Sequence, residues 1–268
     1  MYLLILEKMK QKTVVAVVVN FRYARRHLTK FVNQVRKKGN YRGDILIITD
    51  YFTPLFFFKI LKSDKQIIVK RFKRIKFSQK ARKSLKELNN FNQPNRYLTK
   101  KFQWHKLNLF DMELKKWNFI FYLDVNMQIH FDINPLLELS KKGKFLARAD
   151  GYPDFKKTLS SQFDQTSKIY KALMTKYDLE IRNFFQTGLM FFDTEIISYE
   201  TKEKIIQICE EFPISITNEQ GILNLYFIHY KNIYEELTHY IDDFETYFYW
   251  LKEGQKIIIT KQNVFQYK

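Results

Sequence analysis

The chain has 268 residues, with 46 Lys and Arg against 28 Asp and Glu, which gives a formal net charge of +18. Its single cysteine, Cys209, excludes an internal disulfide framework and a Cys-rich zinc site, and fits a reducing compartment. With only 7 Gly and 5 Pro, no stretch has the composition of a flexible linker. We therefore expect one domain over residues 1–268, with a nucleotide-binding half up to about residue 126 and an acceptor-side half from about residue 127.

The positive charge points to three classes of partner: nucleic acid, an anionic membrane surface, or a small molecule that carries phosphate. The chain is also rich in Lys, Phe, Tyr, Ile and Asn, which A/T-rich codons encode, so genome composition is a second explanation. Such a composition is typical of a large DNA virus or an A/T-rich microbe. The apolar start at residues 1–6 is too short to span a membrane, and no signal-peptide pattern follows. We expect a cytoplasmic protein, in the host cytoplasm or the virion if the source is viral.

Three apolar, β-branched runs predict buried strands at residues 13–19, 44–50 and 66–69. Apolar residues at helical spacing predict a helix over residues 22–38, and this β-α-β order predicts a parallel sheet with helices on both faces. Neither a Gly-x-Gly-x-x-Gly turn nor a Gly-Lys-Ser/Thr phosphate loop is present, which disfavours a Rossmann dehydrogenase and a P-loop enzyme. Asn20 follows the first strand, and we expect it to contact substrate because ligands bind beyond the carboxyl ends of such strands.

The densest basic run extends from Lys70 to Lys86. Two interpretations stay open: contact with a polyanion or a membrane surface, or a solvated strand end that leads into an exposed helix. We favour the second, because runs of charge usually face water. A helix is then expected over residues 97–110, with Trp104 facing the core and Lys106 near the start of the next strand.

The stretch at residues 119–123 is aromatic and aliphatic throughout, as in a central strand covered on both faces. Asp124 and Asn126 follow directly and therefore lie where an open α/β sheet binds its ligands. Two oxygen ligands at this spacing can hold a hard divalent cation such as Mn²⁺ or Mg²⁺. The alternative is that both residues only end the strand, since Asp and Asn favour turns.

The second half repeats this pattern of strands that end in polar residues. A turn with a short helix is expected at residues 131–136, a strand at 145–150 that ends in Asp150, and an irregular lid or acceptor-side insertion at 151–178. A strand over 183–193 contains Gln186, Thr187 and Gly188; glycine inside a strand often marks close approach by a ligand or another backbone. After a helix at 195–211, a second helix is expected to begin near Glu219 and Gln220.

These motifs, in this order, resemble the retaining glycosyltransferases of family 8, the glycogenin and lipopolysaccharide galactosyltransferase type, which have a GT-A fold. The similarity extends from about residue 106 to residue 227. The family's Asp-x-Asp motif is similar to Asp124-Val125-Asn126. Its Asn-Ser/Ala-Gly strand is similar to Gln186-Thr187-Gly188, and its Asp-Gln-Gly/Asp-x-x-Asn helix start is similar to the stretch from Glu219 to Asn224. Lys106 and Asp150 stand where the family has a basic residue and an acid near the donor.

The resemblance implies an α/β protein with a GT-A-type fold, a mostly parallel central sheet flanked by helices. It implies a hexosyltransferase that moves a hexose from a nucleotide-diphosphate sugar, a UDP-sugar, to a hydroxyl of a glycan, protein or lipid with retention of configuration. Asp124 and Asn126 would then hold Mn²⁺ or Mg²⁺. Asp150, Glu219 and Gln220 would be catalytic, and substrate contacts would come from Lys106, Gln186, Thr187, Gly188 and Asn20.

The sequence departs from the family in four places. Gln186 replaces the family's Asn, and Glu219 replaces its Asp. Asn126 replaces the second acid of Asp-x-Asp, so the site carries one negative charge less. The family's His-x-x-Gly-x-Lys-Pro-Trp segment, which supplies a metal-binding His and a diphosphate-binding Lys, is absent. Two alternatives therefore stay open beside the enzyme: a basic module that binds nucleic acid or an anionic surface, including a peripheral membrane contact, and a catalytically degenerate transferase fold. No nucleic-acid-binding motif is present, so we expect no nucleic-acid partner.

Overall fold

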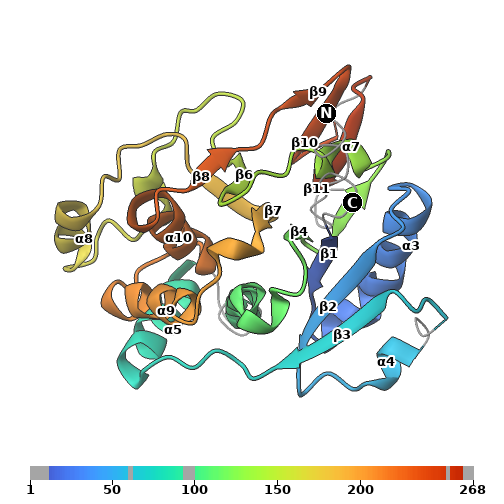
Figure 1. Ribbon diagram of the computed structural model, residues 1–268. Coiled ribbons are helices and arrows are strands. Elements are labelled where there is room, and N and C mark those ends of the chain that lie inside the picture. The colour runs from blue at the N-terminus through green and yellow to red at the C-terminus, as the bar shows by residue number, and fades with distance from the viewer. Residues whose placement is uncertain (1–11, 60–62, 93–99, 252–253, 262–268) are drawn as a thin grey trace.

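The protein is described by a computed structural model that covers residues 12–59, 63–92, 100–251 and 254–261 (Figure 1). Its strands are β1 (Thr13–Val18), β2 (Asp44–Asp50), β3 (Ile67–Phe72), β4 (Phe119–Leu123), β5 (Met127–Ile129), β6 (Phe145–Ala149), β7 (Phe185–Asp193), β8 (Tyr234–Glu236), β9 (Tyr240–Ile241), β10 (Phe244–Phe248) and β11 (Ile257–Lys261). Its α-helices are α2 (Phe21–Tyr23), α3 (Thr29–Lys37), α4 (Phe56–Lys59), α5 (Gln79–Asn92), α7 (Asn134–Leu137), α8 (Tyr170–Lys176), α9 (Thr201–Glu211) and α10 (Glu219–Asn224). Tighter or wider helical turns are η1 (Ala24–Leu28), η2 (Lys101–Phe110), η3 (Met112–Leu114), η4 (Leu159–Gln162), η5 (Thr194–Ile196) and η6 (Leu225–Tyr230).

The main sheet has seven strands in the order β3-β2-β1-β4-β7-β6-β8. The four strands β3, β2, β1 and β4 are parallel, β7 is antiparallel to both β4 and β6, and β8 is parallel to β6. A second sheet has the order β5-β11-β10-β9. The predicted α/β class with a mostly parallel sheet flanked by helices is confirmed.

The alternation of side chains along the central strands divides the core into two layers. On β1 and β4, Val14, Ala16, Ile120 and Tyr122 face one layer, and the residues between them face the other. Helices η2, α9 and α10 cover the first face, whereas α3 and the second sheet cover the other (Figure 1). Asp124 continues the alternation of Ile120 and Tyr122, which directs it toward the η2 and α10 side.

The predicted elements agree with the structure except in detail. The helix expected over 22–38 is present as α2, η1 and α3. Tyr23, one of the residues at helical spacing in this stretch, is 40% exposed and lies outside the core. The helix expected over 97–110 begins at Lys101 in the described residues, and its Trp104 is buried as predicted. Residues 97–99 lie outside the described residues. Within the described ranges, no helix combines the length and the apolar character needed to cross a bilayer.

The aromatic core can be tested at Phe191, which is fully buried on β7 and meets the Phe121 ring edge-on with 5.3 Å between centroids. We expect Phe191→Ala to lower the free energy of unfolding by about 3–5 kcal/mol, because it removes a large buried ring and leaves a cavity. Phe91, 90% exposed on α5, is the matched control, and its substitution by Ala should change stability by less than about 0.5 kcal/mol. Urea denaturation followed by circular dichroism measures both, and equal effects would contradict this account of the core.

Candidate active site

Three charged side chains meet at the carboxyl end of β4. Lys106 Nζ lies 3.0 Å from Asp124 Oδ1, and Lys261 Nζ lies 3.0 Å from Asp124 Oδ2. The hydroxyl of Tyr122 donates a hydrogen bond of 2.6 Å to the same Oδ1. Lys106 Nζ is also 2.9 Å from Glu219 Oε1, so one buried ammonium group joins two carboxylates.

Strand pairing explains how residues far apart in the sequence reach this point. Strand β7 is antiparallel to β4 with Leu123 opposite Leu189, so its first residues lie at the carboxyl end of β4. The backbone N–H of Asp124 donates to the carbonyl oxygen of Gly188 at 2.8 Å, which extends the pairing past the end of the strand. Strand β11 pairs with β5 and places Lys261 opposite Met127, three residues beyond Asp124.

The charges in the cluster stabilise one another. Burial by itself raises the pKa of the Asp124 carboxyl, but Lys106 and Lys261 outweigh this effect and hold that pKa far below its usual value. Burial lowers the pKa of Lys106, and the two carboxylates overcome it, so the pKa is raised. Asp124, Lys106 and Lys261 are therefore all charged at neutral pH.

A chain of hydrogen bonds continues from Lys106 across β7 to α10. Lys106 Nζ donates to the carbonyl oxygen and to the hydroxyl of Thr187, both at 3.2 Å. The Thr187 hydroxyl donates to Glu219 Oε1 at 3.1 Å, and its backbone N–H donates to Gln220 Oε1 at 3.2 Å. The start of β7 and the start of α10 are thus fixed against each other by polar contacts.

The same chain extends to the end of β6. Gln220 Nε2 donates to Gln162 Oε1 at 2.9 Å, and Gln162 Nε2 donates to Asp150 Oδ2 at 3.1 Å. Burial raises the pKa of the Asp150 carboxyl, and its hydrogen-bond partners are neutral amides. Asp150 and Asp124 therefore occupy opposite ends of one polar network, in different electrostatic surroundings.

Two predicted residues join this network from the side. Gln186 Oε1 accepts a hydrogen bond of 3.1 Å from the buried hydroxyl of Tyr247 on β10. A methyl group in place of the Gly188 hydrogen would lie 2.8 Å from Met127 Cε and 3.4 Å from Lys261 Nζ. The absence of a side chain at Gly188 thus leaves room for Met127, which is paired with Lys261 between β5 and β11.

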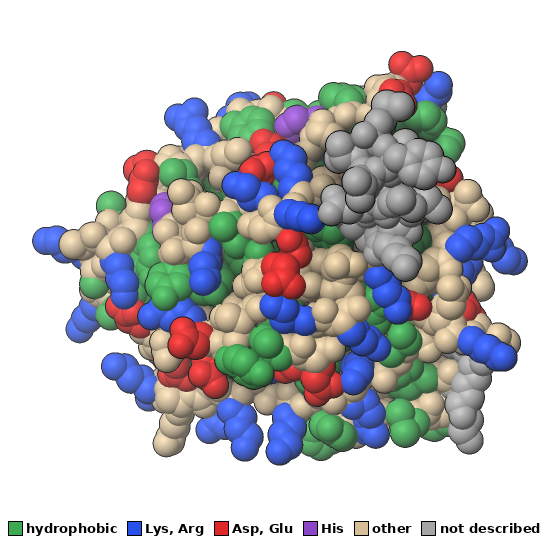
Figure 2. All heavy atoms as spheres, viewed as in Figure 1, with side chains coloured by type: hydrophobic (Ala, Val, Ile, Leu, Met, Phe, Trp, Pro, Cys, Tyr) green, Lys and Arg blue, Asp and Glu red, His purple; other side chains and the backbone are tan. Residues whose placement is uncertain are grey.

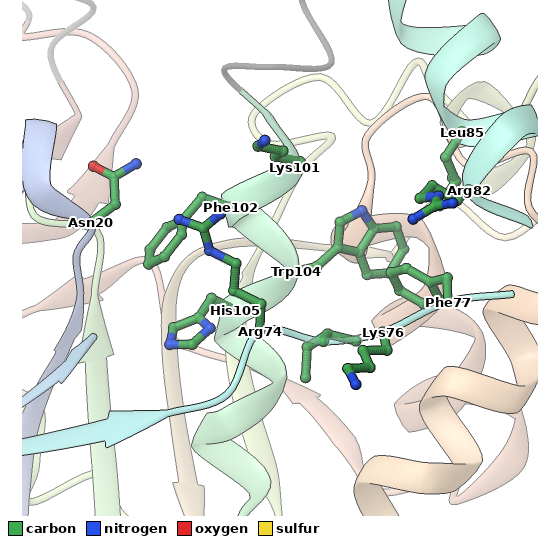
Figure 3. A pocket seen from close by; sticks show the side chains of 11 residues that line it. Asn20, Arg74, Lys76, Phe77, Arg82, Leu85, Lys101, Phe102, Trp104 and His105 are labelled. Atoms are coloured by element: carbon green, nitrogen blue, oxygen red, sulfur yellow. The ribbon is translucent and has the colours of Figure 1, made fainter. Parts of the chain in front are cut away.

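Asn20 lies apart from the charged cluster, at the end of the neighbouring strand β1. Its side chain accepts a hydrogen bond of 3.0 Å from the N–H of Tyr23 and so caps α2. It also lines a pocket of about 350 Å³ between β3, α5 and η2 (Figure 3). Because β1 and β4 are adjacent strands, about 5 Å apart, the pocket and the cluster share one edge of the sheet.

The pocket combines aromatic surface with positive charge. Phe102 and His105, both on η2, are stacked with 4.7 Å between ring centroids. The lining contains four basic side chains and no acidic one: Arg74, Lys76, Arg82 and Lys101. The buried indole N–H of Trp104 has no hydrogen-bond partner among the described residues. Such a lining suits a planar ring that carries phosphate.

The structure therefore brings most predicted site residues together. Lys106, Asp124, Thr187, Glu219 and Gln220 share direct contacts. Asp150 is connected to them by its hydrogen bond with Gln162, and Gly188 by its carbonyl oxygen, which accepts from the Asp124 N–H. Asn20 lies in the adjoining pocket instead, and Asn126 takes no part in the ion pairs of the cluster within the described residues.

Sequence reasoning missed Gln162, Tyr247 and Lys261. Lys261 follows the β-branched run Ile257-Ile258-Ile259-Thr260, so the rule that polar residues matter where strands end would have singled it out. No comparable signal marks Gln162, because it lies in the segment expected to be an irregular insertion.

The residues at Asp124 do not fit a divalent metal ion as they stand. Both Asp124 oxygens already bind ammonium groups, and the other expected ligand, Asn126, is neutral. Among the described residues, no group of three or more His, Cys, Asp or Glu is placed to hold a metal. Two lysines this close repel a dication, so the site would have to release Lys261 before it could bind one.

The basic run from Lys70 to Lys86 contributes to the pocket, because the side chains of Arg74, Lys76 and Arg82 are part of the lining. Other contacts of the run are ion pairs with the protein itself. Lys70 pairs with Glu113 at 2.7 Å, and Arg74 pairs with the buried carboxylate of Asp50 at 2.6 Å. On the face shown in Figure 2, Lys and Arg side chains are spread out, with Asp and Glu side chains among them.

Comparison with solved structures identifies the fold. The chain superimposes on WbbM, a bifunctional glycosyltransferase, with a TM-score of 0.55 and 13% identity over 89% of this chain and 40% of WbbM. It is similar to mouse xyloside xylosyltransferase 1, with a TM-score of 0.54 and 10% identity over 94% and 98% of the two chains. It is also similar to the glycosyltransferase GlyE of Streptococcus pneumoniae TIGR4, with a TM-score of 0.51 and 17% identity over 85% of this chain and 45% of GlyE.

The chain therefore has a GT-A-type glycosyltransferase fold, as the sequence resemblance implied. It spans less than half the length of WbbM and of GlyE. No family model matches the sequence, and no curated protein is significantly similar to it.

The raised pKa of Asp150 gives a pH-dependent prediction. A carboxyl group whose pKa is higher in the folded chain destabilises the fold once it ionises, so Asp150→Asn should raise the unfolding temperature at about pH 7. The gain should shrink as the pH falls and disappear below about pH 3, because the carboxyl of the unfolded chain is then protonated as well. Thermal unfolding at both pH values measures it, with Asp154→Asn as the exposed control. A lower unfolding temperature for Asp150→Asn at neutral pH would contradict the assignment.

Proposed function

We propose that the chain is a glycosyltransferase that transfers a sugar from a nucleotide-diphosphate sugar to a hydroxyl acceptor. The observation that carries this proposal is the continuous polar network from Lys261 and Lys106, through Thr187 and Gln220, to Asp150 at one edge of a GT-A-type sheet. One end of the network holds two ammonium groups, those of Lys106 and Lys261, which can bind a diphosphate. The other end carries a carboxylate and amides, which suit sugar hydroxyls and developing positive charge.

The nucleotide would occupy the pocket beside Asn20. The Phe102 ring, which is stacked on the buried His105 ring, offers an apolar surface for a base, and Arg74 and Lys101 offset phosphate charge. Lys106 follows His105 on η2 and points into the cluster at Asp124. The direction of η2 thus leads from the base to the diphosphate.

In the transfer step, the bond between the anomeric carbon and the diphosphate oxygen breaks, and a bond to the acceptor oxygen forms. The acceptor hydroxyl loses its proton to a departing phosphate oxygen, so charge and atoms balance. Lys106 and Lys261 stabilise the negative charge that develops on the diphosphate. Asp150 stabilises the positive charge on the sugar, and Gln220, hydrogen-bonded to Thr187, orients it.

The finer features of this proposal rest on the resemblance to family 8: a UDP-sugar, a hexose and retention of configuration. The order of the motifs at Asp124, Gln186 and Glu219 supports them, since the structure gathers all three at one edge of the sheet. The acceptor hydroxyl belongs to a glycan, a protein or a lipid. The manganese or magnesium ion of the family is no part of the proposed step, because the residues at Asp124 do not fit it.

Nucleotide binding tests the pocket. Calorimetric titration of UDP, and then of GDP, should show saturable binding to the wild-type chain. Phe102→Ala should weaken it by about tenfold or more, because stacking on an aromatic ring contributes about 1–3 kcal/mol per base. Phe91→Ala, which removes an exposed ring elsewhere, should leave the affinity unchanged. If neither nucleotide binds, the chain shares the fold but not the proposed donor.

Turnover tests the other end of the network. We expect release of the sugar from a panel of UDP-sugars to fall by about a hundredfold or more in Asp150→Asn, since an amide cannot offset positive charge at the sugar. The affinity for UDP should not fall, because the hydrogen bonds of Asp150 run through Gln162 and Gln220, and loss of its negative charge leaves the charge of Lys261 less offset. Binding of UDP without turnover of any sugar donor by the wild type would instead indicate a catalytically degenerate fold.

A further inference from the structure

Lys261 is fixed in the site by the second sheet. Strand β11 pairs antiparallel with β5 through Lys261 opposite Met127, and parallel with β10 on its other side. The Lys261 side chain is only 19% exposed, and its Nζ lies 5.6 Å from the centre of the Tyr249 ring. The ammonium group is therefore held at Asp124 by the backbone and by packing, unlike the end of a flexible surface side chain.

Gly188 holds the backbone of Asp124 in place for this ion pair. The N–H of Asp124 donates to the carbonyl oxygen of Gly188 at 2.8 Å. A methyl group in place of the Gly188 hydrogen would lie only 2.8 Å from Met127 Cε, whereas its distance of 3.4 Å from Lys261 Nζ would be an ordinary van der Waals contact. Gly188 therefore leaves room for Met127, which is paired with Lys261 between β5 and β11.

The charges at this point are already balanced without a metal. Lys106 and Lys261 carry two positive charges, and Asp124 and Glu219 carry two negative ones. An ion bound to an oxygen of Asp124 would lie within about 5 Å of a lysine nitrogen, because metal–oxygen bonds to such ions are about 2 Å long. A diphosphate, in contrast, is attracted by both lysines, and because an ammonium group has three N–H donors, Lys261 can donate to the diphosphate while it stays paired with Asp124.

We propose that Lys261 takes the place of a divalent cation in this site, so that the donor's diphosphate is bound by the ammonium groups of Lys261 and Lys106 and needs no metal ion. This inference rests on the proposed function and refines it. Asp124 then positions two lysines instead of a metal. Asn126 needs no negative charge in such a site.

The first test uses the wild-type chain. UDP is titrated calorimetrically into the protein in the presence of EDTA and again with excess Mn²⁺, and the binding of Mn²⁺ alone is followed by electron paramagnetic resonance. We expect the two UDP affinities to agree within about threefold, and no Mn²⁺ to bind at micromolar concentration.

The second test uses variants of β11. Lys261→Met keeps the length of the side chain and removes its charge, and it should weaken UDP binding in EDTA by about tenfold or more. Lys256→Met is the matched control, because Lys256 lies just before the same strand and its Nζ packs over the exposed side of the Phe244 ring. Lys261→Arg, which keeps the charge, should retain most of the affinity.

The outcomes separate this inference from the proposed function. Binding of UDP that requires Mn²⁺, or equal binding by the wild type and by a folded Lys261→Met variant in EDTA, would overturn the role of Lys261 and leave the transferase in place. Failure of UDP and GDP to bind under either condition would overturn both. Circular dichroism establishes whether each variant is folded. If Lys261→Met does not fold, the wild-type titrations with EDTA and with Mn²⁺ decide whether UDP binding needs a metal ion.

Discussion

The buried ammonium group of Lys106 is the interaction on which the arrangement of the site depends. Its side chain is only 8% exposed, and an unpaired charge at such a position costs several kcal/mol. Asp124 and Glu219 compensate that charge, and they come from the end of β4 and the start of α10. The fold is therefore stable only when η2, β4 and α10 meet at one point, and this meeting also creates the site. The arrangement that neutralises the buried Lys106 charge is thus also the arrangement of the candidate site.

The reversal of strand direction at β7 makes this convergence possible. Four parallel strands deliver their carboxyl ends to one edge, which accounts for Asp124 and for the pocket beside Asn20. Because β7 runs the other way, it brings its first residues, Gln186 to Gly188, to that same edge. Strand β6 is antiparallel to β7 and so again ends there, with Asp150. A wholly parallel sheet would have placed the Gln186–Gly188 motif at the opposite edge.

Much of this could be predicted from local sequence patterns. Apolar runs identified the buried strands, and the polar residues that follow them identified Asp124 and Asp150, because strand ends and ligand sites coincide in this class of fold. The order of the motifs then indicated the fold, which the structure confirms. The direction of β7 could not be predicted, since the buried strand shows the same apolar run in either direction.

The misses have physical causes as well. Tyr23 has the spacing of a core residue, but α2 lies at the edge of the sheet, where its outer side meets solvent. Gln162 lies in the four-residue turn η4, which is too short for any periodicity to indicate burial. Lys261 ends a β-branched run, which marks it as a strand-end residue, but its contact with Asp124, 137 positions away, leaves no trace in a single sequence. The pairing of β11 with β5 brings Lys261 and Asp124 together, and this long-range pairing is decided by tertiary packing.

The position of β11 also has a consequence for biosynthesis. Lys106 and Asp124 belong to neighbouring elements and can pair while the chain is still being translated, whereas Lys261 reaches Asp124 only after the ribosome has added 137 further residues. Domains fold progressively during synthesis, and contacts of such separation form late. A nascent chain can therefore bury most of its core, but the charge balance at Asp124 is completed only after residue 261 has emerged from the ribosome.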